Sequence, residues 1–581
     1  MYNLTAVLAA LQLGQSYVNP SPGAASSEVV SAFQAVNGGT RGHRTDCIVE
    51  PYDVLVPVPA FQPYEETKAN VYRYRQQQGV NLGSLFVHEQ WMTASLFECA
   101  KKPRLAELDI AGGWGGQASA RAVLEKHWDT FVTADSFTYL ASVGINTVRI
   151  PIGHYILGSQ FIVGTPFEPF IDVYKNAWPR LLRVINQAAE VGIGVLIDMH
   201  AAPGSQNGQQ HSGVSDGQTN LFKTQAYQDL LVEALKYLVV QLGPITNVIG
   251  IQILNEPAAD PSLESFYSRA IDNMRQVPKY GKIPIYIHDA FDLNRFLPFV
   301  AGRRDFVVQD HHSYFVFTDS DSKTPADQQT ANVKSSISDS FAKAALSERR
   351  NLVIGEWSCA LTEGSLSSQR DRVQAQRDFC SAQLEMYSSV TAGWYFWSWD
   401  NEQCQNDVGW CFKHAVGIAL PQTFFTYRAI TSASQAQEVA AKIDKWNPLS
   451  DDEISTILHP SSGDVQRQNP GLGSPQHRFG TIYEKRQAGE LQSRQAKSQT
   501  SSVDNPSRIK GVRDGYQTAK VFATYGMSKL AFVEQYIQDA ILRAGSDVIP
   551  SGTEGDYHDG FLRGLAYGEQ KIKVLANLGS P

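Results

Sequence analysis

The stretch VIGIQILNEP at residues 248–257 is a short apolar run that ends in polar residues. Seven other segments have the same form, at residues 79–86, 146–153, 194–200, 284–290, 305–314, 351–358 and 392–401. Stretches of helical period separate most of them, including 133–144, 176–192 and 222–243. Continuous apolar runs indicate strands that are covered on both faces. Eight such strands alternating with helices predict an α/β fold, a closed parallel (β/α)8 TIM barrel.

An open, doubly wound parallel sheet is the alternative architecture for this pattern. The first run, GVNLGSLF at 79–86, contains neither of the glycine-rich phosphate loops that such sheets often carry there, which disfavours the open sheet. Polar or aromatic residues also fall at or near the carboxyl ends of the predicted strands, namely Arg149, His200, Asn255, Glu256, His312, Tyr314, Glu356 and Trp397. In a barrel those ends share one mouth, so these side chains are expected to meet there.

Composition and charge narrow the class of protein. The chain has 581 residues, of which 43% are hydrophobic and 19% charged, so disorder throughout, collagen and small disulfide scaffolds are excluded. Fifty Lys and Arg against 58 Asp and Glu give a net charge of −8, and no basic cluster stands out. Nucleic acid and anionic membrane surfaces are therefore not expected partners, and we expect a monomer without a membrane span.

The domain organisation follows from shifts in composition. Residues 1–70 are expected to form an N-terminal extension with a Pro-rich patch, and residues 71–430 the barrel. Residues 431–506 are expected to be a partly disordered linker, because much of this stretch is rich in Gln, Ser, Pro and Gly. Residues 507–581 regain helical period, and they predict amphipathic helices that dock on the barrel or on a partner.

The cysteines and the first residues bear on the compartment. Six cysteines form no CxxC pair and show no metal-ligand spacing with histidine, which leaves free thiols or one to three disulfides and predicts no metal site. The apolar stretch at residues 4–13 has no Lys or Arg before it, so it is a poor signal peptide. One glycosylation sequon lies at Asn3. These signals do not decide between an intracellular and an extracellular location of the protein.

The chemistry depends on two glutamates. Hydrolysis of an acetal needs one carboxyl to protonate the departing oxygen and a second to attack or to activate water. Glu256 in Asn-Glu-Pro and Glu356 in Gly-Glu-Trp-Ser would project into the barrel mouth from the fourth and seventh strands. Each alone could be a surface glutamate. Together they predict a glycosidase with carboxyls about 5 to 5.5 Å apart, the spacing of a retaining enzyme.

Neighbouring strand ends offer supporting groups. Arg149, His200 and Tyr314 are expected to donate hydrogen bonds that keep Glu356 ionised. Asn255 suits a hydrogen bond to a sugar 2-hydroxyl, a contact that strengthens in the transition state. Trp397 offers an apolar floor for the sugar ring.

A family resemblance rests on short motifs that occur in order between about residues 78 and 425. They are GVNLGSLFVHEQW, NTVRIPIGHY, IDMHAAPGSQNGQQHSG, ILNEP, IHDAF, DHHSYFVF, GEWSCAL and YFWSWDNE. These segments resemble glycoside hydrolase family 5, in its fungal exo-1,3-β-glucanase branch. The resemblance implies Glu256 as acid/base and Glu356 as nucleophile, with no cofactor. It further implies a substrate-binding shell of Glu89, Arg149, His200, Asn255, His312, Tyr314, Phe317 and Trp397, in which Glu89 binds the non-reducing glucose. The family also implies an extracellular or cell-wall location.

The sequence departs from that family at two places. The usual GGW of the first strand is replaced by Gly83, Ser84 and Leu85, so an aromatic near the pocket is expected to be lost. In the loop GSQNGQQ, Gln209 stands where one aromatic of the entrance clamp is expected and Gln210 replaces an acid, while Phe317 matches the other clamp aromatic. The leaving-group side is therefore where this chain is expected to differ.

The function predicted from the sequence is a retaining glycoside hydrolase that releases glucose from the non-reducing end of β-1,3-glucan or a related β-glucoside. A β-glucosidase or diglycosidase acting on a flavonoid or lipid glycoside is the alternative within the family. An inactive carbohydrate-binding barrel, or an assembly factor that works through the C-terminal helices, is the alternative of another class. The presence of both carboxylates argues against an inactive barrel.

Overall fold

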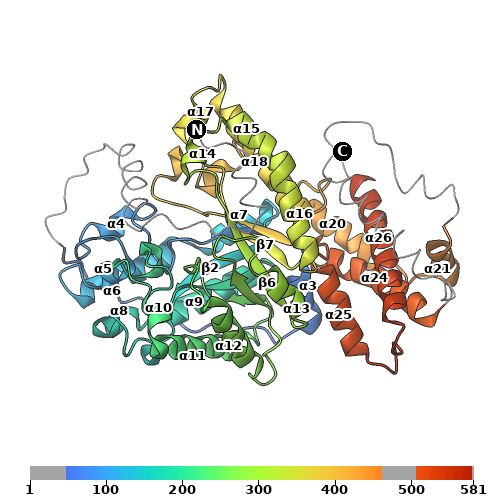
Figure 1. Cartoon of the computed structure of the whole chain (residues 1–581), viewed down its shortest axis with the longest axis horizontal. Helices are drawn as coiled ribbons and strands as arrows, with labels where there is room; N and C mark the ends of the chain where they lie inside the picture. The colour runs from blue at the N-terminus through green and yellow to red at the C-terminus, as the bar shows by residue number, and fades with distance from the viewer. Residues whose placement is uncertain (1–46, 461–504, 579–581) are drawn as a thin grey trace.

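A computed structural model describes residues 47–460 and 505–578 of the chain (Figure 1). The apolar start at residues 4–13 and the Asn3 sequon lie outside these residues, as do residues 461–504 of the expected linker. Residues 47–65 contain no helix or strand and run along the barrel surface, where Arg180 Nη2 donates to the carbonyl of Val54 over 3.1 Å.

Eight parallel strands form a closed barrel in which each strand pairs with the next along the chain and the last pairs with the first. The strands are β1 (Gln77–Asn81), β2 (Thr147–Gly153), β3 (Gly194–Ala201), β4 (Val248–Gln252), β5 (Ile285–His288), β6 (Val307–Ser313), β7 (Leu352–Trp357) and β8 (Gly393–Phe396). The predicted (β/α)8 barrel is confirmed, and the open sheet is excluded.

The barrel is surrounded by helices, and shorter turns of helix fill its loops. The longer helices are α6 (Gln117–Thr130), α7 (Ala134–Ser142), α9 (Ala177–Glu190), α11 (Gln225–Leu242), α12 (Leu263–Arg275), α13 (Leu297–Gly302), α16 (Ser338–Ser347) and α18 (Arg372–Val390). The short ones are α4 (Ala94–Phe97), α5 (Glu107–Ala111), η1 (His154–Ile156), η2 (Ser159–Phe161), η3 (Glu168–Phe170), α8 (Ile171–Tyr174), η4 (Gln210–Ser212), α10 (Asn220–Lys223), η6 (Cys404–Asn406) and α19 (Phe412–Ala415).

The loops after β6 and β7 extend far beyond the strands. They carry α14 (Asp319–Lys323), α15 (Ala326–Asn332), the π-helical turn η5 (Val333–Ile337) and α17 (Glu363–Leu366), in addition to α16 and α18. Of these, α14, α15, α17 and α18 stand together at the top of Figure 1. They extend the molecule on the side of β6 and β7, the strands that carry His312 and Glu356.

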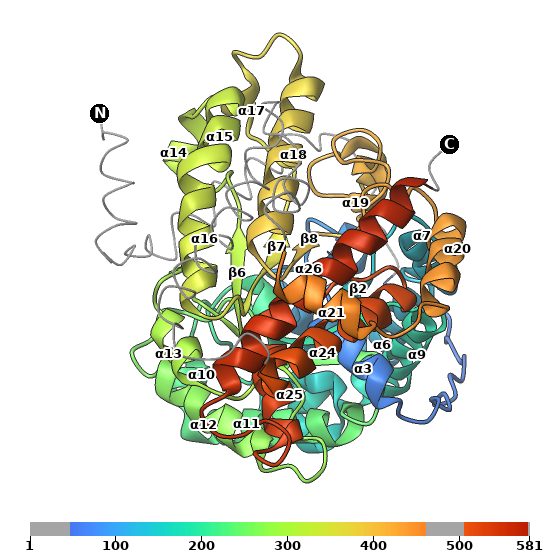
Figure 2. The same cartoon turned by 90° about the vertical axis from the view of Figure 1, so that its right-hand side faces the viewer.

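The other end of the barrel is closed by the C-terminal helices. Helices α24 (Pro506–Thr524), α25 (Val533–Ala544) and α26 (Glu554–Leu578) pack with α3 (Glu66–Tyr74) at the amino ends of the strands (Figure 2). Phe306, just before β6, contacts Phe532 with ring centroids 5.0 Å apart, and Tyr74 donates to Asp539 over 2.6 Å. Of the two outcomes expected, docking on the barrel is found, and the contact is with its amino-end face.

Glycines allow α24 and α26 to cross closely. A Cβ added at Gly515 would lie 2.1 Å from the carbonyl oxygen of Phe561, and one at Gly564 would lie 2.0 Å from that of Val512. No side chain fits at such distances, so the two backbones touch where these glycines meet. The result is a closely packed helical pair whose apolar face, with Phe522 and Phe561, belongs to the core cluster shared with the barrel.

Two boundaries differ from those predicted. Helix α3 crosses the expected boundary at residue 70, because Val71, Tyr72 and Tyr74 pack under the barrel. Part of the expected linker is helical, in α20 (Ala433–Asp444) and α21 (Asp451–Leu458). Both helices have a serine N-cap, and their apolar residues are buried against the rest of the molecule, which composition alone does not reveal.

All six cysteines are paired, as Cys47–Cys99, Cys359–Cys380 and Cys404–Cys411. Of the outcomes left open by the sequence, the one with three disulfides is therefore found. Within the described ranges, no helix combines the length and the hydrophobicity needed to cross a membrane.

Because Phe532 is completely buried between the C-terminal helices and the barrel, Phe532→Ala should destabilise the protein by about 3–5 kcal/mol. Leu542, which lies on α25 and is 65% exposed, provides the matched control. Leu542→Ala should change the free energy of unfolding by less than about 0.5 kcal/mol. Urea titration measures both variants, and equal effects would show that the helices do not seal the barrel.

Candidate active site

Glu256 and Glu356 both lie at the carboxyl-end mouth of the barrel. Glu356 is part of β7, and Glu256 follows β4 by four residues. Glu256 has a φ of +40°, a left-handed conformation that is unusual for a residue with a side chain. Such strain is retained where the surrounding structure holds a side chain in a required direction.

Glu356 is surrounded by hydrogen-bond donors. Arg149 Nη1 donates to its Oε1 over 2.9 Å, and the Tyr314 hydroxyl donates to its Oε2 over 2.8 Å. Both contacts were predicted and are confirmed. Since a guanidinium can only donate, this arrangement favours a negatively charged carboxylate at Glu356.

His312 connects the two carboxylates. Its Nδ1 lies 2.7 Å from Oε1 of Glu256 and 3.4 Å from Oε2 of Glu356. One nitrogen in contact with both places these two oxygens no more than about 6 Å apart, which fits the retaining geometry and is below the usual inverting separation. Nε2 of His312 faces Asp310 at 3.2 Å.

The three groups titrate as one unit. Burial raises the pKa of the Glu356 carboxyl to about 7, against the influence of His312 and Arg149. Burial acts in the same direction on Glu256, but the hydrogen bond and charge of His312 outweigh it and bring the pKa of Glu256 to about 2. Burial disfavours charge on His312 too, yet Glu356 and Asp310 raise its pKa to about 10.

His312 therefore carries a proton at neutral pH and holds it against Glu256. Transfer of this proton along the 2.7 Å contact gives a protonated Glu256 and a neutral His312 with no change in total charge. Glu356, which Arg149 contacts, remains the carboxylate in that state. In the resting site the pKa values place this proton on His312, so Glu256 becomes an acid only through that transfer.

His200 does not contact Glu356, contrary to the prediction. Its Nδ1 lies 2.7 Å from Oδ2 of Asp198, and its ring is parallel to that of Trp397 with centroids 5.8 Å apart. The reason is the alternation along β3, where Asp198 and His200 point to the same side and bond each other. His200 packs against Trp397 and lies beside Asn255, whose Nδ2 is 3.4 Å from its Nε2.

Trp397 approaches the first strand closely. A Cβ on Gly83 would lie 2.9 Å from the Trp397 ring, so this position requires glycine. Leu85 is fully buried in the core, which shows that position 85 does not face the mouth in this chain.

A cluster of four aromatic rings lies beside the carboxylates: Trp91, Tyr314, Phe317 and Trp410. The Trp410 ring contacts the other three at centroid distances of 5.7, 5.4 and 6.1 Å, respectively. Trp91 Nε1 donates to Oε2 of Glu89 over 2.9 Å, which connects the cluster to the glutamate expected to bind glucose. Phe317 is 53% exposed, as a ring that receives a ligand must be.

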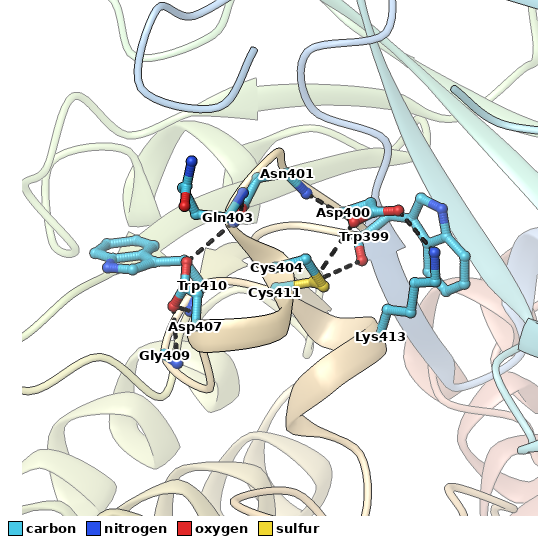
Figure 3. Close-up of a disulfide and its surroundings, with 10 residues drawn as sticks. All are labelled: Trp399, Asp400, Asn401, Gln403, Cys404, Asp407, Gly409, Trp410, Cys411 and Lys413. Atoms are coloured by element: carbon cyan, nitrogen blue, oxygen red, sulfur yellow. Dashed lines mark hydrogen bonds and ion pairs between the residues drawn. A yellow bond between two sulfur atoms is a disulfide. The ribbon is translucent and has the colours of Figure 1, made fainter. Parts of the chain in front are cut away.

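Trp410 is held by a short disulfide-closed loop (Figure 3). The bond Cys404–Cys411 closes the loop, and Asp407 accepts hydrogen bonds from the backbone N–H groups of Gly409 and Trp410 over 3.1 and 2.8 Å. In Figure 3 the Trp410 ring points away from the disulfide, on the side opposite to Lys413. The loop presents the ring with little freedom to move.

Comparison with known proteins places this geometry in a family. The Cellulase model of glycosyl hydrolase family 5 matches residues 115–403. Glucan 1,3-beta-glucosidase 3 of Schizosaccharomyces pombe is 37% identical over 337 residues, which cover 57% of this chain and 70% of that protein. The chain belongs to glycosyl hydrolase family 5. It is a glycoside hydrolase, and the resemblance seen in the motifs is confirmed.

Other relatives of this family 5 hydrolase are more distant. Probable glucan 1,3-beta-glucosidase A of Aspergillus fumigatus is 31% identical over 364 residues, covering 56% of this chain and 82% of that protein. Among solved structures, rutinosidase from Aspergillus niger is 17% identical, covers 59% of this chain and 96% of that chain, and has a TM-score of 0.48.

Several residues of the family 5 hydrolase site were not singled out in the sequence. They are Asn81, Trp91, Asp198, His211, Asp310 and Trp410. Most lie in or beside a strand-end segment, which was the signal that could have found them. Trp410 lies 14 residues after β8, and only folding of the loop brings it back to the mouth.

The residues at the expected entrance lie on the loop after β3. Gln209 is exposed just before η4, and Gln210 begins that turn. The next residue, His211, points to Glu256, with its Nε2 3.6 Å from Oε2. The departure from the family pattern in this loop therefore lies beside the carboxyl expected to act as acid/base.

Burial, together with the charges of Glu356 and Glu256, raises the pKa of Glu89 from 4.5 to about 8, although Trp91 opposes the rise. A raised pKa means that Glu89 stabilises the fold most below pH 4.5 and that this contribution is lost as the pH rises through about 8. Glu89→Gln should therefore reduce the loss of stability between about pH 4.5 and 8, by at most about 1.4 kcal/mol per pH unit. Urea titrations across that range measure the slope.

The control is Glu233→Gln, because Glu233 is an exposed glutamate on α11. It should keep the wild-type slope. A Glu89→Gln slope equal to that of the wild type would show that Glu89 is ionised throughout.

Proposed function

We propose that this glycoside hydrolase is a retaining β-glucosidase that releases glucose from the non-reducing end of β-1,3-glucan or a related β-glucoside. The observation that carries the proposal is the contact of one nitrogen, His312 Nδ1, with both Glu256 and Glu356. The names of the two curated relatives support a 1,3-linked glucan as substrate.

In the first step the Glu356 carboxylate attacks the anomeric carbon, and the bond from that carbon to the leaving-group oxygen breaks. Glu256 gives its proton to that oxygen, so the leaving group departs as an alcohol. Arg149 and Tyr314 orient the attacking carboxylate through the contacts described above. The product of this step is a glucosyl ester of Glu356 and an ionised Glu256.

In the second step water replaces the ester. Glu256 takes a proton from the water, whose oxygen bonds to the anomeric carbon, and Glu356 leaves as a carboxylate. Glu256 regains its acid form, and the configuration at the anomeric carbon has been inverted twice. After the second step the proton can return from Glu256 to His312 Nδ1 along their 2.7 Å contact, which restores the starting charge state.

The glucose pocket is proposed to comprise Glu89, Asn255 and Trp397, with His200 as support. Asn255 accepts from Arg149 Nη2 over 2.7 Å, which fixes the amide next to the acid. Phe317 and Trp410 are proposed to contact the second sugar or another leaving group. Because Gln209 and Gln210 lie on the loop that carries His211 beside Glu256, a flavonoid or lipid glycoside is the second candidate substrate, and product analysis on laminarin, rutin and a glucosyl lipid distinguishes the two.

We further infer an oxidising compartment for the folded enzyme. Three disulfides use all six cysteines, and such bonds persist outside the reducing cytosol. This supports the extracellular or cell-wall location implied by the family.

Glu356→Gln should lower kcat on every β-glucoside by more than roughly 10⁴-fold, because no ester can form. Glu256→Gln removes the acid, so kcat/KM should fall roughly 10²- to 10⁴-fold on phenyl β-glucoside. The same variant should retain kcat/KM on 2,4-dinitrophenyl β-glucoside, whose leaving group needs no proton. Steady-state kinetics on both substrates measures these effects.

Azide rescue then separates the two roles. With Glu256→Ala it should give β-glucosyl azide, because azide attacks the ester and the anomeric carbon is inverted twice. With Glu356→Ala it should give α-glucosyl azide, because no ester forms and the anomeric carbon is inverted once. The opposite products would mean that the roles are exchanged.

Trp410→Ala should raise KM for laminari-oligosaccharides roughly 5-fold, as expected for about 1 kcal/mol lost with one aromatic face. The double variant Cys404→Ser/Cys411→Ser frees the loop and should act in the same direction. Trp178→Ala is the control, since Trp178 packs on Tyr237 among the outer helices and should affect stability only. An unchanged KM for Trp410→Ala would remove this ring from the binding site.

A further inference from the structure

His211 faces the proposed acid/base from the side opposite to His312. Its Nε2 lies 3.6 Å from Oε2 of Glu256, while His312 Nδ1 lies 2.7 Å from Oε1. The two oxygens of one carboxyl therefore face two different imidazoles. His312 is completely buried at its side chain, whereas the His211 side chain is 18% exposed. The Oε2 side of this carboxyl therefore faces the more exposed of the two imidazoles.

The other nitrogen of His211 continues a chain of polar groups. Its Nδ1 lies 3.4 Å from Nε2 of His200 and 3.3 Å from Nδ2 of Asn255. His200 Nδ1 in turn lies 2.7 Å from Oδ2 of Asp198. A carboxylate at that distance fixes the proton of His200 on Nδ1 and leaves Nε2 as an acceptor.

Two tautomers of His211 fit this chain. With the proton on Nδ1, it donates to His200, and an unprotonated Nε2 faces Glu256 in its acid form. With the proton on Nε2, a polar N–H group faces the ionised Glu256, and Nδ1 accepts from Asn255. Burial lowers the pKa of His211, so the neutral ring that both arrangements need is the favoured form.

The loop holds His211 in this place. The hydroxyls of Ser205 and Ser212 are 2.6 Å apart, and Gly213 follows with a φ of +90°. Asn207 Nδ2 donates to the backbone carbonyl of Glu256 over 2.9 Å and lies 3.3 Å from His211 Nε2. The turn and the strained Glu256 backbone are therefore tied together.

We propose that His211 is a positioning residue for the acid/base: its imidazole, 3.6 Å from Oε2 of Glu256, holds the carboxyl in place from that side in both its acid and its base form. The inference rests on the proposed function, since it takes Glu256 as the proton donor. Glu256 gives one proton to the leaving-group oxygen and regains one from water, and His211 neither gains nor loses a proton overall.

The test compares leaving groups in His211→Asn and His211→Phe. Phenyl β-glucoside needs a proton on its leaving group, and 2,4-dinitrophenyl β-glucoside does not. We expect kcat/KM to fall roughly 10-fold or more on the former and less than about 3-fold on the latter, as for partial loss of general-acid catalysis. A series of aryl β-glucosides should then show a steeper dependence of kcat/KM on leaving-group pKa in both variants. A residue with a merely structural role would not make kcat/KM depend more steeply on the leaving-group pKa.

His558→Asn is the matched control. His558 on α26 pairs with Glu534 over 2.8 Å and is 17% exposed, similar to His211, but it lies at the other end of the barrel. It should leave both substrates unaffected. Urea titration establishes that the His211 variants are folded, and His211→Phe retains a ring in the turn should the Asn variant fail to fold.

Equal losses on both substrates, or no loss on either, would overturn the role of His211 while leaving the glucosidase proposal intact. A wild-type enzyme that hydrolyses neither glucoside would instead overturn the proposed function, and the role of His211 with it.

Discussion

One fully buried guanidinium, that of Arg149, joins the catalytic end of the barrel. From β2 it donates to Asn81 on β1, Gln252 on β4, Asn255 beyond β4 and Glu356 on β7, and it forms an ion pair with Asp198 on β3. A buried charge is tolerated only when it is paired and its donors are satisfied. The strand ends must therefore stay in register for the charge to be stable, and the same register sets the position of the nucleophile. The Arg149 guanidinium therefore contributes both to the stability of the barrel and to the position of the proposed nucleophile.

The two ends of the barrel are built on different principles. The mouth is polar, with carboxylates, imidazoles and amides that bond one another and leave oxygens directed to a ligand. The amino end is apolar and is sealed by helices from the end of the chain, with aromatic contacts such as Phe306 to Phe532. The C-terminal helices are thus part of the catalytic barrel's core, although they lie far from the proposed chemistry.

The sequence predicts the barrel, its eight strands and the meeting of Glu256 with Glu356, because buried strands and strand-end polar residues are local patterns. It does not predict the direction of His200, which depends on its bond to Asp198, nor Trp410, which a disulfide loop returns to the mouth. The helical part of the expected linker was missed as well, because its polar composition hides the buried positions of α20 and α21. The local pattern of apolar and polar residues predicts whether a segment is a helix or a strand. Contacts between loops join residues that are far apart in the sequence, so they become visible only in the folded chain.

The central claim is that Glu356 attacks the sugar directly. Incubation with 2-deoxy-2-fluoro-β-glucosyl fluoride, followed by proteolysis and mass spectrometry, tests it, because the fluorine slows hydrolysis of the ester. The account predicts one fluoroglucosyl group on the peptide that contains Glu356. A group on Glu256, or rapid turnover of ordinary β-glucosides with α-glucose as the first product, would contradict it.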